Sequence, residues 1–126
     1  MHNDKISDFA TRIRNASLVG KTEVTMKKTK LLKSIADVMV QERYLEAATT
    51  VDDKLIVTLK YVDGAPALNS IKRISKPGMR VYKKSSDLGR ILSGLGVGII
   101  STSQGVMSDK VCKKQKLGGE VLLELW

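Results

Sequence analysis

Three hydroxyls and one amide crowd a single short turn of the sequence, Ser101-Thr102-Ser103-Gln104-Gly105. Such short side chains donate and accept hydrogen bonds in a tight space, so they can contact base edges, ribose 2′-hydroxyls or phosphates. They can equally satisfy the backbone of their own turn. Gly105 would allow a positive φ or a close backbone approach. The residues of this turn leave both interpretations open.

A second unusual turn, Leu117-Gly118-Gly119-Glu120, sets a carboxylate beside a glycine pair. A carboxylate can accept a hydrogen bond from the amino group of a base, which gives recognition by shape rather than by charge. The structural alternative is that Glu120 begins a strand or pairs with a lysine such as Lys116.

The densest basic stretch has no acidic residue between Asp63 and Asp87, and it consists of Lys72, Arg73, Lys76, Arg80, Lys83 and Lys84. Gathered at the edge of a small sheet, these side chains would bind phosphates, and binding would weaken as salt rises. A solvated face that keeps the protein in solution is the alternative. Tyr82 lies within the stretch, where it would either stack on an unpaired base or pack half-buried on the sheet.

A smaller basic group, Lys28-Thr29-Lys30, precedes an apolar helical pattern. Thr29 is a suitable N-cap for that helix. The backbone N–H groups of a helix N-terminus favour anions, and the two lysines would reinforce this preference.

Nucleophilic and metal chemistry lack their usual residues, because the chain has one histidine, His2, and one cysteine, Cys112. The glycines from Gly94 to Gly98 follow a predicted helix and precede a strand, which is the reverse of a dinucleotide fingerprint. A phosphate-handling enzyme that uses this segment with Lys84 or Arg90 is the weaker alternative. We therefore expect no catalytic residue, no metal site, no cofactor and no small-molecule substrate.

The overall charge favours a polyanionic partner. Across 126 residues, 22 lysines and arginines oppose 13 acids, which gives a net charge of +9. A field of this sign attracts RNA, DNA or an anionic membrane surface. No apolar run approaches the roughly 20 residues that span a bilayer, and no signal-peptide pattern is present, so we expect no membrane partner.

Hydrophobic spacing predicts the elements that position these groups. A helix capped by Asn3-Asp4 is expected to end at Gly20, and a strand over 23–26 precedes the helix that Thr29 caps. Strands over 45–51 and 55–61 complete an α-β-α-β-β order, which predicts a sheet with helices on one face. The turn residues Asp63 to Pro66 then mark a boundary, so residues 1–62 form the predicted N-terminal α/β-type domain.

The second half is predicted to be mostly β, with strands over 68–74, 79–82, 97–101 and 120–125. Short helices are expected after Ser86-Asp87 and after Ser108-Asp109. The fold class is thus α+β in two small domains, with residues 63–126 as the C-terminal one. This half carries 11 basic and 5 acidic residues against 11 and 8 in the first half, so it is the expected centre of polyanion contact.

Several segments resemble the family of the bacterial-type small-subunit ribosomal protein eight, in one collinear order across essentially the whole chain. They are Thr11–Asn15, Arg73–Tyr82, Gly94–Gly98, Ile100–Asp109 and Leu117–Leu122. The Ser-Thr-Ser turn and the later Gly-Gly-Glu are very specific together. The chain departs from the family pattern at Gln104, where a basic residue is common, and at Lys76, where arginine precedes Pro-Gly. These changes put one phosphate contact and one bidentate contact in doubt.

The resemblance implies a two-domain, non-catalytic protein of a cytoplasmic or organellar ribosome. It would bind a bent stem in the central domain of small-subunit ribosomal RNA, organise RNA folding and subunit assembly, and contact neighbouring ribosomal proteins. By analogy it would also repress its own messenger RNA, and a stand-alone messenger RNA regulator is the other alternative. The implied C-terminal RNA surface comprises Ser101, Thr102, Ser103, Gly105, Gly119 and Glu120, with Tyr82, Lys83 and Lys84 beside them. The implied N-terminal contacts are Lys28, Thr29 and Lys30, helped by Arg12 and Arg14.

Overall fold

The computed structural model describes residues 4–88 and 95–126. Contacts divide the chain into two compact units, each with its own core. The N-terminal unit is Lys5–Asn69, and the C-terminal unit consists of Ser70–Trp126 together with the chain start up to Asp4. The prediction of an α+β fold with two small domains is confirmed. Within the described ranges, no helix is both long and apolar enough to cross a membrane.

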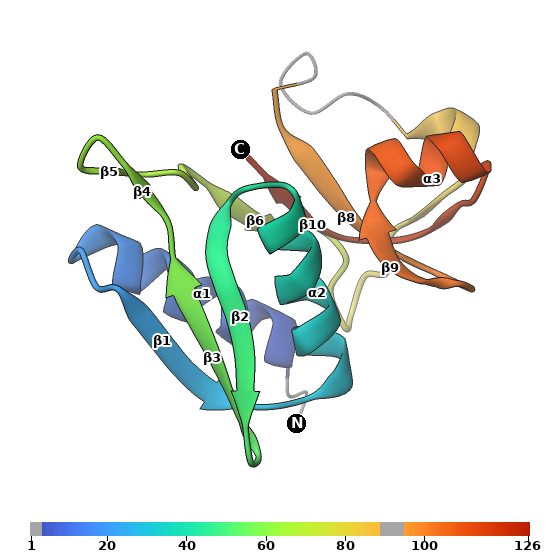
Figure 1. The fold of residues 1–126 in the computed structure, drawn as a ribbon. Coiled ribbons are helices and arrows are strands. Elements are labelled where there is room, and N and C mark those ends of the chain that lie inside the picture. Colours follow the sequence, from blue (N-terminus) through green and yellow to red (C-terminus); the bar gives the residue numbers. More distant parts are fainter. Residues whose placement is uncertain (1–3, 89–94) are drawn as a thin grey trace. The chain divides into compact units, whose positions relative to one another are not determined.

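The N-terminal unit begins in the predicted α-β-α-β-β order. Its elements are α1 (Lys5–Leu18), β1 (Glu23–Lys27), α2 (Lys30–Gln41), β2 (Leu45–Val51) and β3 (Lys54–Leu59). The strands form an antiparallel sheet in the order β1-β3-β2, and both helices lie against one face of it (Figure 1). Period-four spacing buries Phe9 and Ile13 of α1, and alternation buries Leu55 and Val57 of β3.

A short hairpin follows the three-stranded sheet in this unit. Strands β4 (Tyr61–Val62) and β5 (Ala65–Pro66) pair across Asp63-Gly64. Both turn residues have positive φ, 52° at Asp63 and 81° at Gly64, as a primed hairpin turn requires. The Tyr61 hydroxyl also donates to the carbonyl of Lys21 at 2.6 Å. The turn is therefore part of the N-terminal unit, which extends to Asn69.

The C-terminal unit is a sheet of five strands in which β10 is central. The elements are β6 (Ile71–Arg73), β7 (Tyr82–Lys83), η1 (Ser85–Asp87), β8 (Val97–Thr102), β9 (Gly105–Ser108), α3 (Asp109–Gln115) and β10 (Gly119–Leu125). The strand order is β6-β10-β8-β9, and β7 also pairs with β10. Apolar residues of β8 and β10, among them Ile99, Leu123 and Leu125, are fully buried.

Differences from the predicted elements in this unit are local. The first two strands are shorter than the 68–74 and 79–82 ranges that the sequence predicts, and β9 is an additional strand. The helix predicted to follow Ser86-Asp87 does not begin there, because these two residues lie in the short 3-10 helix η1 and Leu88 after them is extended. The predicted helix positions Ile91 and Leu92 lie outside the described residues. Ser108 does cap α3, since its hydroxyl accepts from the Val111 amide at 3.3 Å.

The lone cysteine belongs to the core. Cys112 is fully buried with Leu88, Ile100 and Val121. Burial, and secondarily the nearby carboxylate of Asp109, raises the pKa of its thiol above the ordinary value. A buried thiol that is held protonated is a poor nucleophile.

Candidate nucleic-acid interface

The turn Ser101–Gly105 closes the β8–β9 hairpin, and we call these five residues the hydroxyl hairpin. Their last strand pair is Thr102 with Gly105, so Ser103 and Gln104 form a two-residue loop. The Thr102 hydroxyl donates to the Gly105 carbonyl at 2.7 Å and accepts from the Gln104 amide at 3.1 Å. Of the two roles that the sequence left open, the Thr102 hydroxyl therefore has the structural one, since it hydrogen-bonds to the backbone of its own turn. Gly105 has a φ of 116°, a conformation open to glycine and strained for other residues.

The other two hydroxyls of the turn differ in exposure. Ser103 is exposed at the tip together with Gln104, whereas Ser101 is only partly exposed near the end of the strand ladder. The hairpin therefore presents Ser103 outward on a loop closed by the two hydrogen bonds of the Thr102 hydroxyl. The small Ser103 side chain at this tip suits close approach to a folded polyanion.

The glycine pair explains how this hairpin meets the basic stretch. A Cβ on Gly119 would lie 2.1 Å from the Ser101 carbonyl oxygen, and one on Gly118 would lie 2.5 Å from the Lys83 carbonyl oxygen. Both approaches are far closer than carbon and oxygen tolerate, so only glycine fits either position. The sequence predicts a turn at this glycine pair. It does not show that the backbone at Ser101 approaches Gly119 and the backbone at Lys83 approaches Gly118.

Beside the glycine pair lies an open hollow of about 540 Å³, which we call the lysine groove. It is lined by Tyr82, Lys83, Lys84, Ser85, Lys116, Gly118 and Gly119. Tyr82 is 68% exposed, so it does not pack half-buried on the sheet and its ring is accessible for stacking. Lys116 was named from the sequence only as a possible partner of Glu120, and the structure adds it to the groove.

Glu120 pairs with Arg80 and Ser75 rather than with Lys116. Its Oε2 atom accepts from Arg80 Nη1 at 3.0 Å and from the hydroxyl of Ser75. Ser75 is fully buried, and its Oγ also accepts from the Val81 amide at 3.1 Å. The carboxylate that the sequence suggested for base contact is thus tied into the fold.

Arg73 is also withdrawn from the basic stretch. Its guanidinium makes two contacts with the Asp4 carboxylate, at 3.3 and 3.4 Å, and donates to the Leu122 carbonyl at 3.1 Å. Its side chain is only 7% exposed. Both arginines of the stretch therefore serve internal carboxylates, whereas the lysines Lys72, Lys76, Lys83 and Lys84 are exposed.

The basic group of the N-terminal unit is built around a helix cap. Thr29 Oγ1 accepts from the Leu32 amide at 3.1 Å, as an N-cap should. The Lys28 amide donates to the Asp53 carbonyl at 2.7 Å, which anchors the chain before the cap. The side chains of Lys28 and Lys30 are exposed on either side of Thr29.

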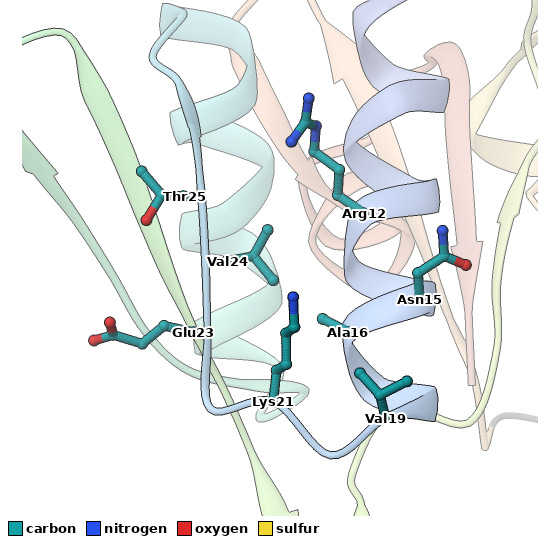
Figure 2. Close-up of a pocket in the computed structure, with 8 residues that line it drawn as sticks. All are labelled: Arg12, Asn15, Ala16, Val19, Lys21, Glu23, Val24 and Thr25. Carbon is teal, nitrogen blue, oxygen red and sulfur yellow. The ribbon is translucent and has the colours of Figure 1, made fainter.

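Arg12 lines a hollow of about 470 Å³ between α1 and β1. Figure 2 shows the Lys21 side chain extending upward between Val24 and Ala16, and the Arg12 side chain projecting from α1 above Ala16. Glu23 and Thr25 point away from α1. Arg12 Nε also pairs with Asp8 at 2.9 Å, one helical turn away. Arg14 is exposed and is not among the residues that line this hollow.

Comparison with known proteins agrees with the fold and the turn motifs. The family described as Ribosomal protein S8 matches residues 4–126. The chain is 43% identical over 126 residues to small ribosomal subunit protein uS8 of Nitratidesulfovibrio vulgaris (strain DSM 19637 / Miyazaki F), covering 100% of both chains. It is 44% identical to uS8 of Rippkaea orientalis, covering 98% of each, and 44% identical to uS8c of Guillardia theta, covering 100% of each. The resemblance in the turn motifs is therefore confirmed along the full length, and the chain belongs to the ribosomal protein S8 family.

Proposed function

We propose that the protein is a structural component of the small ribosomal subunit that binds directly to a stem in the central domain of small-subunit ribosomal RNA. Membership of the ribosomal protein S8 family makes it a ribosomal component and not an enzyme. The full-length relatives named small ribosomal subunit protein uS8 support the assignment to that subunit.

One observation carries the proposal of direct RNA binding. Glu120 on β10 pairs with Ser101 of the hydroxyl hairpin on one side and with Tyr82 of the lysine groove on the other. At the glycine pair, the backbone of β10 lies very close to Ser101 of the hydroxyl hairpin and to Lys83 of the lysine groove, so these two surfaces adjoin. A tip of small hydroxyl side chains therefore lies one strand away from an exposed aromatic ring and three lysines. Shape contacts, base stacking and phosphate contacts are the three means by which proteins recognise irregular RNA.

The proposed mechanism separates attraction from recognition. The net charge of +9 draws the protein to RNA, and phosphates then occupy the lysine groove. The hydroxyl hairpin fits a distorted groove of the stem through Ser101, Thr102, Ser103 and Gly105. Tyr82 stacks on an unpaired base. Gly119 and Glu120 lie at the junction. Binding then holds helical segments of the RNA in the orientation that subunit assembly and neighbouring ribosomal proteins require.

The N-terminal unit would supply additional phosphate contacts. Lys28 and Lys30 are exposed at the Thr29 cap, where the helix terminus also favours an anion. Arg12 and Arg14 are exposed on α1 of the same unit. These residues would add affinity without reading sequence, because phosphate contacts carry no base information.

A comparable stem in the protein's own messenger RNA would present the same shape to the same surface, so we propose repression of that message as a second role. Copurification distinguishes a ribosomal component from a stand-alone messenger RNA regulator. A ribosomal component cosediments with small subunits in stoichiometric amount, whereas a stand-alone regulator does not.

Direct binding is tested with the full-length chain and a transcribed stem from the central domain of small-subunit ribosomal RNA. We expect tight binding to this stem and much weaker binding to a regular duplex of equal length in the same salt. Equal affinity for both RNAs would leave only unspecific electrostatic attraction and would contradict the proposal.

A further inference from the structure

We propose that Glu120 is a positioning residue, which with Ser75 and Arg80 fixes the segment 75–81 and thereby holds the lysine groove in place. This inference rests on the proposed function, because the groove matters only if it binds RNA. It assigns Glu120 an indirect role in binding, in place of the direct contact with a base that its position among the turn residues suggests.

The chain between β6 and β7 makes an excursion away from the sheet. The segment leaves β10 at Ser75, whose amide donates to the Val121 carbonyl at 3.0 Å. It reverses at Pro77-Gly78, where Lys76 and Met79 exchange two backbone hydrogen bonds of 2.9 Å. It returns at Val81, whose carbonyl accepts from the Val121 amide at 2.9 Å. Both ends of this excursion are thus attached to one residue of β10.

A chain of hydrogen bonds closes the base of the excursion. Ser75 Oγ accepts from the Val81 amide and donates to Glu120, so the hydroxyl links the two ends of the segment to the carboxylate. Arg80 donates to the same oxygen, Oε2, at 3.0 Å. The Glu120 side chain is 17% exposed and that of Arg80 is 47% exposed, so the pair lies at the border of the core. A carboxylate in such a place requires partners, and these three groups supply them to one another.

Strand β7 connects this closure to the groove. Val81 is followed directly by β7, in which Tyr82 pairs with Glu120 and Lys83 pairs with Gly119. A two-residue strand has little pairing energy of its own, so its register depends on what fixes its ends. Removal of the Ser75–Glu120–Arg80 hydrogen bonds would release Val81 and, with it, the positions of Tyr82 and Lys83. RNA binding should therefore depend on residues that need not touch RNA.

Substitution of Ser75 is the decisive test of the proposal, because a residue with 0% exposure cannot contact RNA directly. The substitutions are Ser75→Ala, Glu120→Ala and Arg80→Met in the full-length chain, with Lys110→Met as the matched control. Lys110 is exposed on α3 of the same unit and lies outside the lysine groove, so its replacement removes one positive charge without touching Glu120. Arg80→Met is the variant least threatening to the fold, since the arginine is half exposed.

Two measurements are made on each variant. Amide hydrogen exchange of Val81 and Val121 is followed in the free protein, and affinity for the central-domain stem is measured at fixed salt. We expect faster exchange and about a tenfold loss of affinity for Ser75→Ala, Glu120→Ala and Arg80→Met, with only a small loss of affinity for Lys110→Met. The double variant of Ser75→Ala and Glu120→Ala should have the same affinity for the stem as the single variant that binds more weakly. Both changes disrupt the same hydrogen-bond network, so their effects should not add. Arg80→Lys should restore part of the loss.

The proposal is overturned if exchange at Val81 stays at the wild-type rate while Glu120→Ala alone loses affinity, because Glu120 then contacts RNA directly. Losses that add in the double variant lead to the same conclusion. If Ser75→Ala does not fold, the comparison of Arg80→Met with Lys110→Met decides the matter by the same criteria. Failure of the wild-type chain to bind the stem would instead refute the proposed function, while the exchange data would still report on the positioning role.

Discussion

The backbone carbonyl of Ser101 and the Cα of Gly119 lie so close that a Cβ on Gly119 would be 2.1 Å from the Ser101 oxygen. This contact joins the last residues of β8 to the first residue of β10. On the other side, Gly118 meets the carbonyl of Lys83. The hydroxyl hairpin and the lysine groove are therefore parts of one surface that a single added methyl group would separate.

Gly119→Ala should therefore disrupt the pairing of β10 with β8 near Ser101. We expect a loss of about 2 kcal/mol or more in the free energy of unfolding, because overpacking against backbone cannot be relieved by a rotamer change. Denaturant unfolding measures this loss. Gly78→Ala is the control, since a Cβ there meets nothing within 4 Å. Equal stability of the two variants would show that the backbone spacing at Gly119 is not restrictive.

Ser103→Phe should weaken stem binding by at least about tenfold, because a bulky ring at the exposed hairpin tip prevents close approach to the RNA. The free energy of unfolding should stay unchanged, since Ser103 is exposed and the turn is held by Thr102. Thr50→Phe, an exposed hydroxyl residue on β2, serves as control. Unchanged affinity of the Ser103 variant would remove the hairpin tip from the interface.

Thr102→Val should act differently, because it removes the hydroxyl that closes the turn. Both hydrogen bonds of this hydroxyl disappear, and we expect a destabilisation of about 1 kcal/mol together with weaker RNA binding. Backbone relaxation of the 101–105 hairpin, measured by NMR, should show increased motion. A turn that stays rigid in this variant would indicate that Ser103 and Gln104 are held by other contacts.

Double replacement of Lys83 and Lys84 by alanine should lower the slope of log affinity against log salt. We expect a change of about one unit for each phosphate that the variant no longer neutralises. Replacement of Lys113 and Lys114 in the last turn of α3 removes the same charge and is the control. Salt titrations of stem binding compare the two variants. If both change the slope equally, net charge rather than the groove determines binding.

Arg73→Met should affect stability and leave the salt dependence of binding unchanged. The guanidinium is nearly buried with Asp4 and the Leu122 carbonyl, so its removal leaves the carboxylate without that partner. We expect a destabilisation of about 2 kcal/mol, measured by denaturant unfolding. Lys72→Met, at the adjacent exposed position, should leave stability nearly unchanged. A salt slope that falls in the Arg73 variant would return this arginine to the RNA surface.

Local patterns were sufficient for the elements that bury a regular face. The spacing of Phe9 and Ile13 predicted α1, and Thr29 and Ser108 were correctly predicted as helix caps. Strand β9 was not predicted, because its four residues, Gly105–Ser108, begin at a turn glycine and show no clear alternation. The turn residues Asp63-Gly64, which suggested a domain boundary in the sequence, form a hairpin turn. A turn inside a unit has the same composition as a linker, so composition alone does not locate a boundary.

The candidate site was predictable in its residues but not in their roles. The pairing of Glu120 with Arg80, rather than with the nearby Lys116, depends on an excursion of the chain that spacing does not reveal. Two arginines of a continuous basic run proved to be internal partners, because Asp4 and Glu120 approach them only in the folded unit. Ion pairs with carboxylates, rather than exposure alone, distinguish the two arginines from the exposed lysines, since the Arg80 side chain is itself 47% exposed.

The central claim is that RNA lies on the surface formed by the hydroxyl hairpin and the lysine groove. Ultraviolet cross-linking of the full-length chain to the central-domain stem, followed by mass spectrometry of the adducts, tests it most directly. We expect cross-links within residues 82–85 and 101–105, with Tyr82 prominent among them. Adducts confined to surfaces such as the exposed turn between β2 and β3, with none at Tyr82 or the hairpin tip, would contradict it.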